Sequence, residues 1–265
     1  MWVHNYPTRT LLPNSGPCAE DFYTILQPQG TSYDGFKHGD NALLTRAYDT
    51  DIQQKKSRFP GGVEIVDTPG EDIANAETVD MLYFCGHGDP SQIYFAEKKS
   101  GVADSDDTAP YDEINLGDGP LKWLVLDACQ VLENTLISGN WSIFNRWTKA
   151  FNPGGGLRYI LGFHTTCKND NFRGKMFAQF LNPIQGNMDG EYIRIAWQYA
   201  CEETEPNTSE WAILRVGDQN SGIANDRWTS GVLQHDVPLV PGSGKQKFTY
   251  QKRIGPVATT PEIIG

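Results

Sequence analysis

Three short apolar runs constrain the fold of this chain more than any other feature of its sequence. They occupy residues 79–85 (VDMLYFC), 121–126 (LKWLVL) and 157–163 (LRYILGF). Each run is nearly continuous and is bounded by Gly, Pro or Asp, which is typical of a strand buried on both faces of a sheet. Two further runs, 63–66 (VEIV) and 211–216 (WAILRV), predict additional strands.

Helical patterns separate these strands. We expect helices within residues 21–26, 41–48, 141–151, 171–181 and 191–203. Strands that alternate with helices predict an α/β fold with a mostly parallel central sheet and helices on both faces. We therefore expect one domain over residues 1–265.

Two segments are expected to lie outside this alternating core. Residues 225–265 are predicted to be a C-terminal extension packed on the domain, with an edge strand around 247–250 (KFTY). Residues 103–119 are acidic and rich in turn-forming residues, which predicts a surface loop. The carboxylates within residues 104–112 could attract calcium, but the spacing of a calcium-binding loop is missing, so we expect solvated charge.

Composition limits the partners and the compartment. The formal net charge of -11 argues against nucleic acid, because phosphate binding needs clustered Lys and Arg. No apolar run is long enough to cross a membrane, and the N-terminus lacks the pattern of a signal peptide. The five cysteines are too sparse for a disulfide scaffold, so a reducing, cytoplasmic setting is expected.

The residues that follow the apolar runs carry the chemistry. His87 follows the first run, Cys129 follows the second, and His164 and Cys167 follow the third. In open parallel sheets, functional sites form beyond the carboxyl ends of the strands. The sequence therefore predicts that an imidazole and a thiol meet at one edge of the sheet.

This pair suits nucleophilic catalysis. Cysteine attacks as a thiolate, so it needs a base or a cation within hydrogen-bond reach, and His87 can serve as that base. The imidazole can then donate the proton to a departing amine. Gly88 has no side chain, so its backbone N–H and that of Cys129 could together stabilise an oxyanion.

The order of these motifs resembles the caspase-like (clan CD) cysteine peptidases, which include caspases, metacaspases, gingipains and CHAT domains. The resemblance rests on an apolar strand ending in His87-Gly88 and a later one ending in Asp127-Ala128-Cys129, and it covers residues 60–218. Residues 157–186 and 193–203 are especially similar to a CHAT domain. The resemblance implies a caspase–hemoglobinase-like three-layer sandwich and an endopeptidase acting on peptide or protein substrates. It implies no required cofactor and leaves room for a regulatory protein partner.

The resemblance also implies a preference for Arg or Lys before the cleaved bond. In metacaspase-like enzymes the acid two places before the nucleophile lines the pocket for a basic residue, and Asp127 has that place. Asp21, after Cys18, resembles a second pocket acid. His164 is expected to shape the cleft. Either aspartate could instead cap a helix, and Gln130 departs from the small residue usual after the nucleophile.

Other functions remain open on sequence grounds. The same dyad could ligate or cyclise peptides, and an inactive relative could serve as a binding module. A zinc site is a further alternative, because Cys85, His87, Cys129, His164 and Cys167 all carry metal-type ligands. An enzyme that cuts after basic residues could also cleave itself at Lys98-Lys99.

Overall fold

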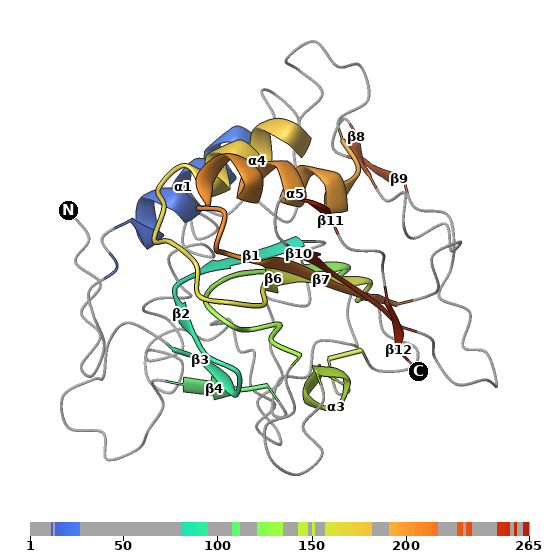
Figure 1. Cartoon of the computed structure of the whole chain (residues 1–265). Helices are drawn as coiled ribbons and strands as arrows, with labels where there is room; N and C mark the ends of the chain where they lie inside the picture. Colours follow the sequence, from blue (N-terminus) through green and yellow to red (C-terminus); the bar gives the residue numbers. More distant parts are fainter. Residues whose placement is uncertain are drawn as a thin grey trace, which may run out of the picture.

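The fold is seen in a computed structural model of the chain (Figure 1). It describes residues 12, 14–26, 81–94, 108–111, 121–134, 143–147, 150–151, 157–181, 191–216, 227–229, 232–234, 248–254, 257–258 and 262–264. The helix expected at 41–48, the strand expected at 63–66 and the Lys98-Lys99 pair lie outside these residues.

A seven-stranded sheet forms the centre of the described structure. Its strands run in the order β1-β5-β6-β7-β10-β11, and β12 also pairs with β10. Their bounds are β1 Met81–Cys85, β5 Trp123–Asp127, β6 Tyr159–Phe163, β7 Trp211–Val216, β10 Phe248–Ile254, β11 Val257–Ala258 and β12 Glu262–Ile264. The strands expected from residues 79–85, 121–126, 157–163 and 211–216 are all present.

The sheet is mixed, which corrects the expectation of a mostly parallel one. β1, β5 and β6 are parallel neighbours, whereas β7 is antiparallel to both β6 and β10. Two helices in succession, α4 Arg173–Leu181 and α5 Ile193–Thr204, connect β6 to β7. Each helix reverses the direction of the chain, so two of them return the next strand antiparallel, whereas a single crossover helix would return it parallel.

The helices cover the sheet unequally. Figure 1 shows α4 and α5 on one face together with α1 Ser15–Leu26, while the short α3 Ile143–Trp147 lies on the other side. Near α3 lies a three-stranded sheet of β2 His87–Gly88, β3 Gln92–Tyr94 and β4 Thr108–Pro110. A separate hairpin joins β8 Arg227–Thr229 to β9 Val232–Gln234. Within the described residues, no helix is both long and apolar enough for a membrane span.

The central strands are buried throughout. Every residue of β1, β5, β6 and β7 is buried, as their continuous apolar runs predict. Helix α1 packs on one side of this core through Phe22. The ring of Phe22 stacks on Tyr83 of β1, with 4.4 Å between the ring centroids, and on Phe177 of α4, with 5.6 Å between the centroids. The helices therefore fix the position of β1, whose carboxyl end leads into the candidate site.

Two segments differ from their expected form. Strand β4 and the fully buried Tyr111 lie within the segment expected to be a surface loop, because Tyr111 donates a hydrogen bond to the carbonyl oxygen of Asp89 at 2.6 Å. In the C-terminal segment, β10 is an inner strand between β7 and β12 rather than an edge. The alternating pattern of this segment allowed a strand but did not identify its neighbours.

Candidate active site

The register of β1 and β5 determines which residues meet at the edge of the sheet. Cys85 pairs with Asp127 in this parallel ladder, and the N–H of Gly86 donates to the carbonyl oxygen of Asp127 at 3.1 Å. His87 and Cys129 each follow two positions after this last pair. The two residues singled out from the sequence therefore leave neighbouring strands at the same edge.

Gly88 lies directly against the turn that carries Cys129. A Cβ atom on Gly88 would lie 2.9 Å from the carbonyl oxygen of Cys129 and 2.7 Å from Cγ1 of Val131. Both distances are shorter than real Cβ contacts allow, so only glycine lets β2 approach this closely. The segment that carries His87 is thus in van der Waals contact with the segment that carries Cys129.

The hairpin of β2 and β3 also orients the N–H of Gly88. The N–H of Asp89 donates to the carbonyl oxygen of Gln92 at 3.0 Å, so these two residues form a hydrogen-bonded pair. Hydrogen-bonded and non-bonded pairs alternate along an antiparallel ladder, which makes the next pair, Gly88 with Ile93, a non-bonded one. The N–H of Gly88 therefore points away from β3.

Gly88→Ala is expected to reduce the free energy of unfolding by about 1–3 kcal/mol, the usual effect of overpacking. The added methyl group would force β2 away from the Cys129 turn. Urea denaturation measures the change. Thr166→Ala, an exposed change on the same rim, should alter stability by less than about 0.5 kcal/mol. Equal effects of the two variants would contradict the close packing at Gly88.

Cys129 is partly exposed and interacts closely with Cys167. The two Sγ atoms lie 3.5 Å apart, and the backbone N–H of Cys167 donates to Sγ of Cys129 at 3.2 Å. The hydrogen bond from the Cys167 thiol, together with that from its N–H, lowers the pKa of Cys129 to about 7, although burial opposes this shift. The thiolate is therefore well populated at neutral pH.

The turn after Cys129 has an unusual backbone. Gln130 has a φ of 57°, a left-handed conformation that is uncommon outside glycine. Its N–H donates to the carbonyl oxygen of Thr165 at 3.0 Å, which ties the turn to the segment after β6. The turn thus holds Cys129 next to Cys167.

The lowered pKa of Cys129 predicts the pH dependence of its alkylation by iodoacetamide. A lowered pKa favours the thiolate, so the rate should be small in acid, rise with a midpoint near 7 and level off above it. Mass spectrometry can follow Cys129 alone, because trypsin releases it within residues 123–146 and Cys167 within residues 159–168.

The variant Cys167→Ala tests whether the hydrogen bond from Cys167 causes the low alkylation midpoint of Cys129. Cys167→Ala removes the side-chain donor, so the midpoint should move up toward that of an ordinary thiol, about 8.5. Cys201→Ala is the matched control, since Cys201 is fully buried elsewhere in the core. An unchanged midpoint in Cys167→Ala would show that another group stabilises the thiolate.

Arg146 of α3 holds the two site segments together. Its guanidinium is buried and donates to the carbonyl oxygens of Pro90 and Glu133. The neighbouring Trp147 donates its indole N–H to the carbonyl oxygen of Val131 at 3.2 Å. One short helix thus binds both the turn after His87-Gly88 and the turn after Cys129.

Asp127 has an internal counter-ion. Its side chain is 1% exposed, and it forms an ion pair with Arg173 of α4, which also pairs with the equally buried Glu205. Burial opposes the charge of Arg173, but the carboxylate of Asp127, together with Cys167, Cys201 and Tyr83, outweighs this effect and raises the pKa of the guanidinium well above its ordinary value. A guanidinium from the chain itself therefore occupies the position that we expected a substrate side chain to take.

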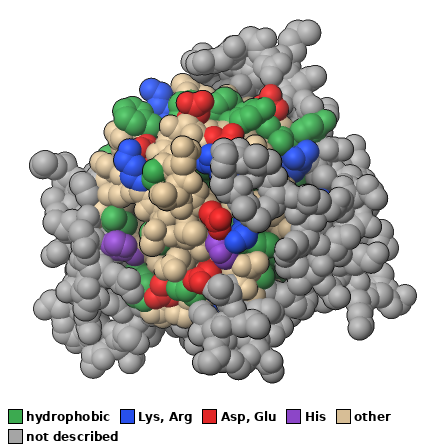
Figure 2. Space-filling model, viewed as in Figure 1, with side chains coloured by type: hydrophobic (Ala, Val, Ile, Leu, Met, Phe, Trp, Pro, Cys, Tyr) green, Lys and Arg blue, Asp and Glu red, His purple; other side chains and the backbone are tan. Residues whose placement is uncertain are grey.

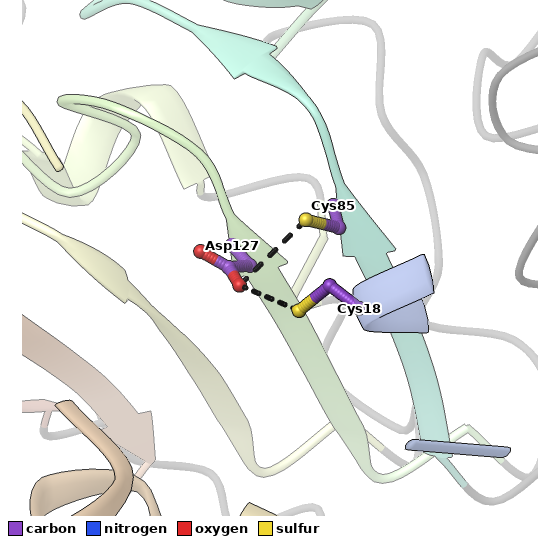
Figure 3. Close-up of side chains that lie close together, drawn as sticks. All are labelled: Cys18, Cys85 and Asp127. Atoms are coloured by element: carbon purple, nitrogen blue, oxygen red, sulfur yellow. Dashed lines mark hydrogen bonds between the residues drawn. The ribbon is translucent and has the colours of Figure 1, made fainter. Parts of the chain in front are cut away.

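The second oxygen of Asp127 lies in a buried cluster with Cys18 of α1 and Cys85 of β1 (Figure 3). The thiols donate to Oδ2 at 3.6 Å and 3.7 Å, and the hydroxyl of Tyr83 donates to the same atom at 2.8 Å. Sγ of Cys18 also accepts the N–H of Gly174 at 3.1 Å. The cluster joins α1 and α4 to the two parallel strands.

This cluster is not the zinc set considered from the sequence. Its three ligand atoms lie within 4.8 Å of one another, as metal ligands can. Hydrogen bonding to Cys18 and burial raise the pKa of Cys85 well above its usual value, which favours a protonated thiol that donates to Asp127. Arg173 already neutralises Asp127, so the arrangement fits protonated thiols that donate to a carboxylate.

The remaining two predicted site residues take other positions. Asp21 is partly buried on α1, and within the described contacts that helix reaches Asp127 through Cys18 instead. His164 is 9% exposed, and its Nδ1 accepts the N–H of Asn134 at 3.2 Å and lies 3.1 Å from the hydroxyl of Tyr250. Burial lowers the pKa of His164, and the nearby Lys252 lowers it further. These contacts hold the imidazole of His164 against Asn134 and Tyr250, and its part in shaping a cleft stays a prediction.

On the face shown in Figure 2, the described acidic and basic side chains are interspersed, so neither sign of charge dominates. One such group joins Glu210 to Lys252 at 3.1 Å and to Nε2 of His164 at 3.6 Å. The net negative charge of the chain therefore does not translate into an acidic patch on this part of the surface.

The sequence did offer a signal for Arg173 and Arg146, which we did not predict. Arg173 shares its helical face with Phe177 and Leu181, all of which are buried. A charged residue within the apolar stripe of a helix needs a buried partner. Arg146 likewise adjoins the buried Trp147.

The comparisons with known proteins identify a family. A family model described as a domain of unknown function, DUF6345, matches residues 1–245, so the chain belongs to that family. The match includes His87, Cys129, Cys167 and Arg173, and it ends before β10. Searches of curated proteins and of solved structures gave no match.

Proposed function

We propose that this protein is a cysteine endopeptidase of the caspase-like type, in which Cys129 is the nucleophile and His87 the general base. Cys129 attacks the scissile carbonyl and forms an acyl-enzyme, while His87 passes a proton to the departing amine. A water molecule, activated by His87, then releases the acyl group. In this proposal the fold is a three-layer sandwich with helices on both faces of the sheet.

The observation that carries this proposal is the contact between Gly88 and the Cys129 turn. It brings the backbone of the segment that carries His87 against the turn that carries Cys129, which supports the proposal that the two residues share one site. The lowered pKa and partial exposure of Cys129 support a nucleophile that a substrate can reach.

Backbone donors support the acyl-transfer step. The N–H of Gly88 points away from β3, and within the described part of the chain the N–H of Cys129 makes no hydrogen bond. Backbone N–H donors of this kind suit the oxyanion of a tetrahedral intermediate.

The expected preference for Arg or Lys needs a source other than Asp127. Both oxygens of this carboxylate accept hydrogen bonds within the protein, and Arg173 neutralises its charge. A substrate guanidinium would have to displace a buried one at a large desolvation cost.

A panel of fluorogenic peptides tests the function. The peptides differ in the residue before the fluorophore (Arg, Lys, Asp, Asn or Leu) and are incubated with the wild type, Cys129→Ala and the matched control Cys201→Ala. We expect turnover by the wild type and by Cys201→Ala, and none by Cys129→Ala. Addition of an amine acceptor distinguishes hydrolysis from ligation by mass spectrometry of the products.

Two results would contradict the proposal. Full turnover by Cys129→Ala would exclude this nucleophile, and a wild type that alkylates at Cys129 but cleaves no peptide would favour a binding role. Cleavage after Asp or Asn alone would retain the catalytic mechanism and exclude the basic preference.

A further inference from the structure

The proposed peptidase needs one thiol at its site, but the structure brings two together. Cys167 approaches Cys129 with its sulfur at 3.5 Å, and both residues are partly exposed. The other three cysteines, Cys18, Cys85 and Cys201, are buried. A dissolved oxidant can therefore reach this pair more readily than any other thiol of the chain.

We propose that Cys129 and Cys167 form a reversible redox pair, in which a peroxide oxidises Cys129 and Cys167 then closes a disulfide with it. The proposal concerns a modification site and stands without any peptidase activity. If Cys129 is also the nucleophile proposed above, the disulfide switches that activity off, and this consequence alone rests on the proposed function.

The geometry needs only a small movement. The sulfur atoms must approach from 3.5 Å to about 2.05 Å. Cys167 lies between β6 and α4 in a segment that forms neither strand nor helix, so its backbone is free of ladder hydrogen bonds. The next residue, Lys168, is anchored by its N–H, which donates to Glu205 at 2.9 Å, and by its carbonyl oxygen, which accepts from Arg173 at 2.9 Å.

The chemistry balances in two steps. The thiolate of Cys129 attacks one peroxide oxygen, the O–O bond breaks, and the leaving oxygen takes a proton, which gives a sulfenic acid and water or an alcohol. The sulfur of Cys167 then attacks the sulfur of Cys129. The S–O bond breaks, and hydroxide leaves with the proton of Cys167 as water. Two thiols are oxidised for each peroxide reduced.

The electrostatic interaction between the two thiols determines which of them reacts first. While Cys129 is a thiolate, its hydrogen bond with Cys167, together with burial, raises the pKa of Cys167 well above its usual value. Oxidation removes that negative charge, so Cys167 loses its proton more easily once the sulfenic acid has formed. The nearby Arg173 favours the Cys167 thiolate as well. Cys129 thus reacts first and Cys167 resolves.

Peptide mapping after hydrogen peroxide treatment tests the pair in the full chain. In the wild type, two of the five thiols should be lost, and residues 123–146 should appear linked to residues 159–168 in a tryptic digest. A dithiol reductant should restore both. Cys201→Ala should form the same link, whereas Cys167→Ser should accumulate sulfenic acid, trapped by dimedone, and then sulfinic acid at Cys129.

The outcomes separate this inference from the proposed function. Sulfinic acid at Cys129 without linked peptides in the wild type, or a link between buried cysteines instead, would overturn the redox pair. The wild-type map alone gives this answer if Cys167→Ser does not fold. A linked pair in a protein whose reduced form cleaves no peptide would support the redox pair and count against the peptidase.

Discussion

His87→Ala is expected to lower kcat/KM for peptide cleavage by about 10²–10⁴, the usual contribution of a positioned general base. The reason lies in proton transfer, since in the proposed mechanism His87 passes the proton to the departing amine and activates the water. The measurement is initial-rate kinetics on whichever peptide of the panel the wild type cleaves fastest, over a range of pH.

A second readout distinguishes catalysis from structural damage. The lowered pKa of Cys129 derives first from Cys167, so His87→Ala should keep the alkylation midpoint of Cys129 near 7 while it loses turnover. His164→Asn removes a different imidazole, one bound to Asn134 and Tyr250, and should retain turnover if it folds. Retained turnover in His87→Ala would leave the proposed mechanism without its base.

The strands and helices of the core were predictable because their patterns are local. A buried strand such as β5 needs an unbroken apolar run, and that run can be read without knowing its neighbours. Direction and order within the sheet are not local. The antiparallel direction of β7 relative to β6 depends on how α4 and α5 pack. The position of β10 in the sheet depends on its pairing with β7, which lies far away in the chain.

The candidate site divides in the same way. His87, Gly88 and Cys129 follow strands, so the rule that parallel strands end at one edge predicted their common position. Partners that reach the site from other elements were harder to foresee. We expected Asp127 to bind a cationic side chain of a substrate, yet Arg173 of α4 forms an ion pair with it. A sequence shows that a carboxylate needs a partner, but packing decides which one it receives.

Arg173→Met is expected to reduce the free energy of unfolding by about 3–5 kcal/mol, because it leaves buried charge without a counter-ion. Arg173 is 1% exposed and pairs with both Asp127 and Glu205, each 1% exposed. Removal of the guanidinium would leave two buried carboxylates beside each other. Urea denaturation measures the change, with Lys168→Met as the control.

The control, Lys168→Met, also replaces a cationic side chain by methionine, but at a position where solvent screens the charge. The side chain of Lys168 is 61% exposed and pairs with Asp170, so its loss should cost at most about 1 kcal/mol. The double variant Asp127→Asn with Arg173→Met should recover part of the stability lost by Arg173→Met alone, because one of the stranded charges is gone. If Arg173→Met is as stable as Lys168→Met, Asp127 does not depend on this ion pair, and its carboxylate could again bind a cation from a substrate.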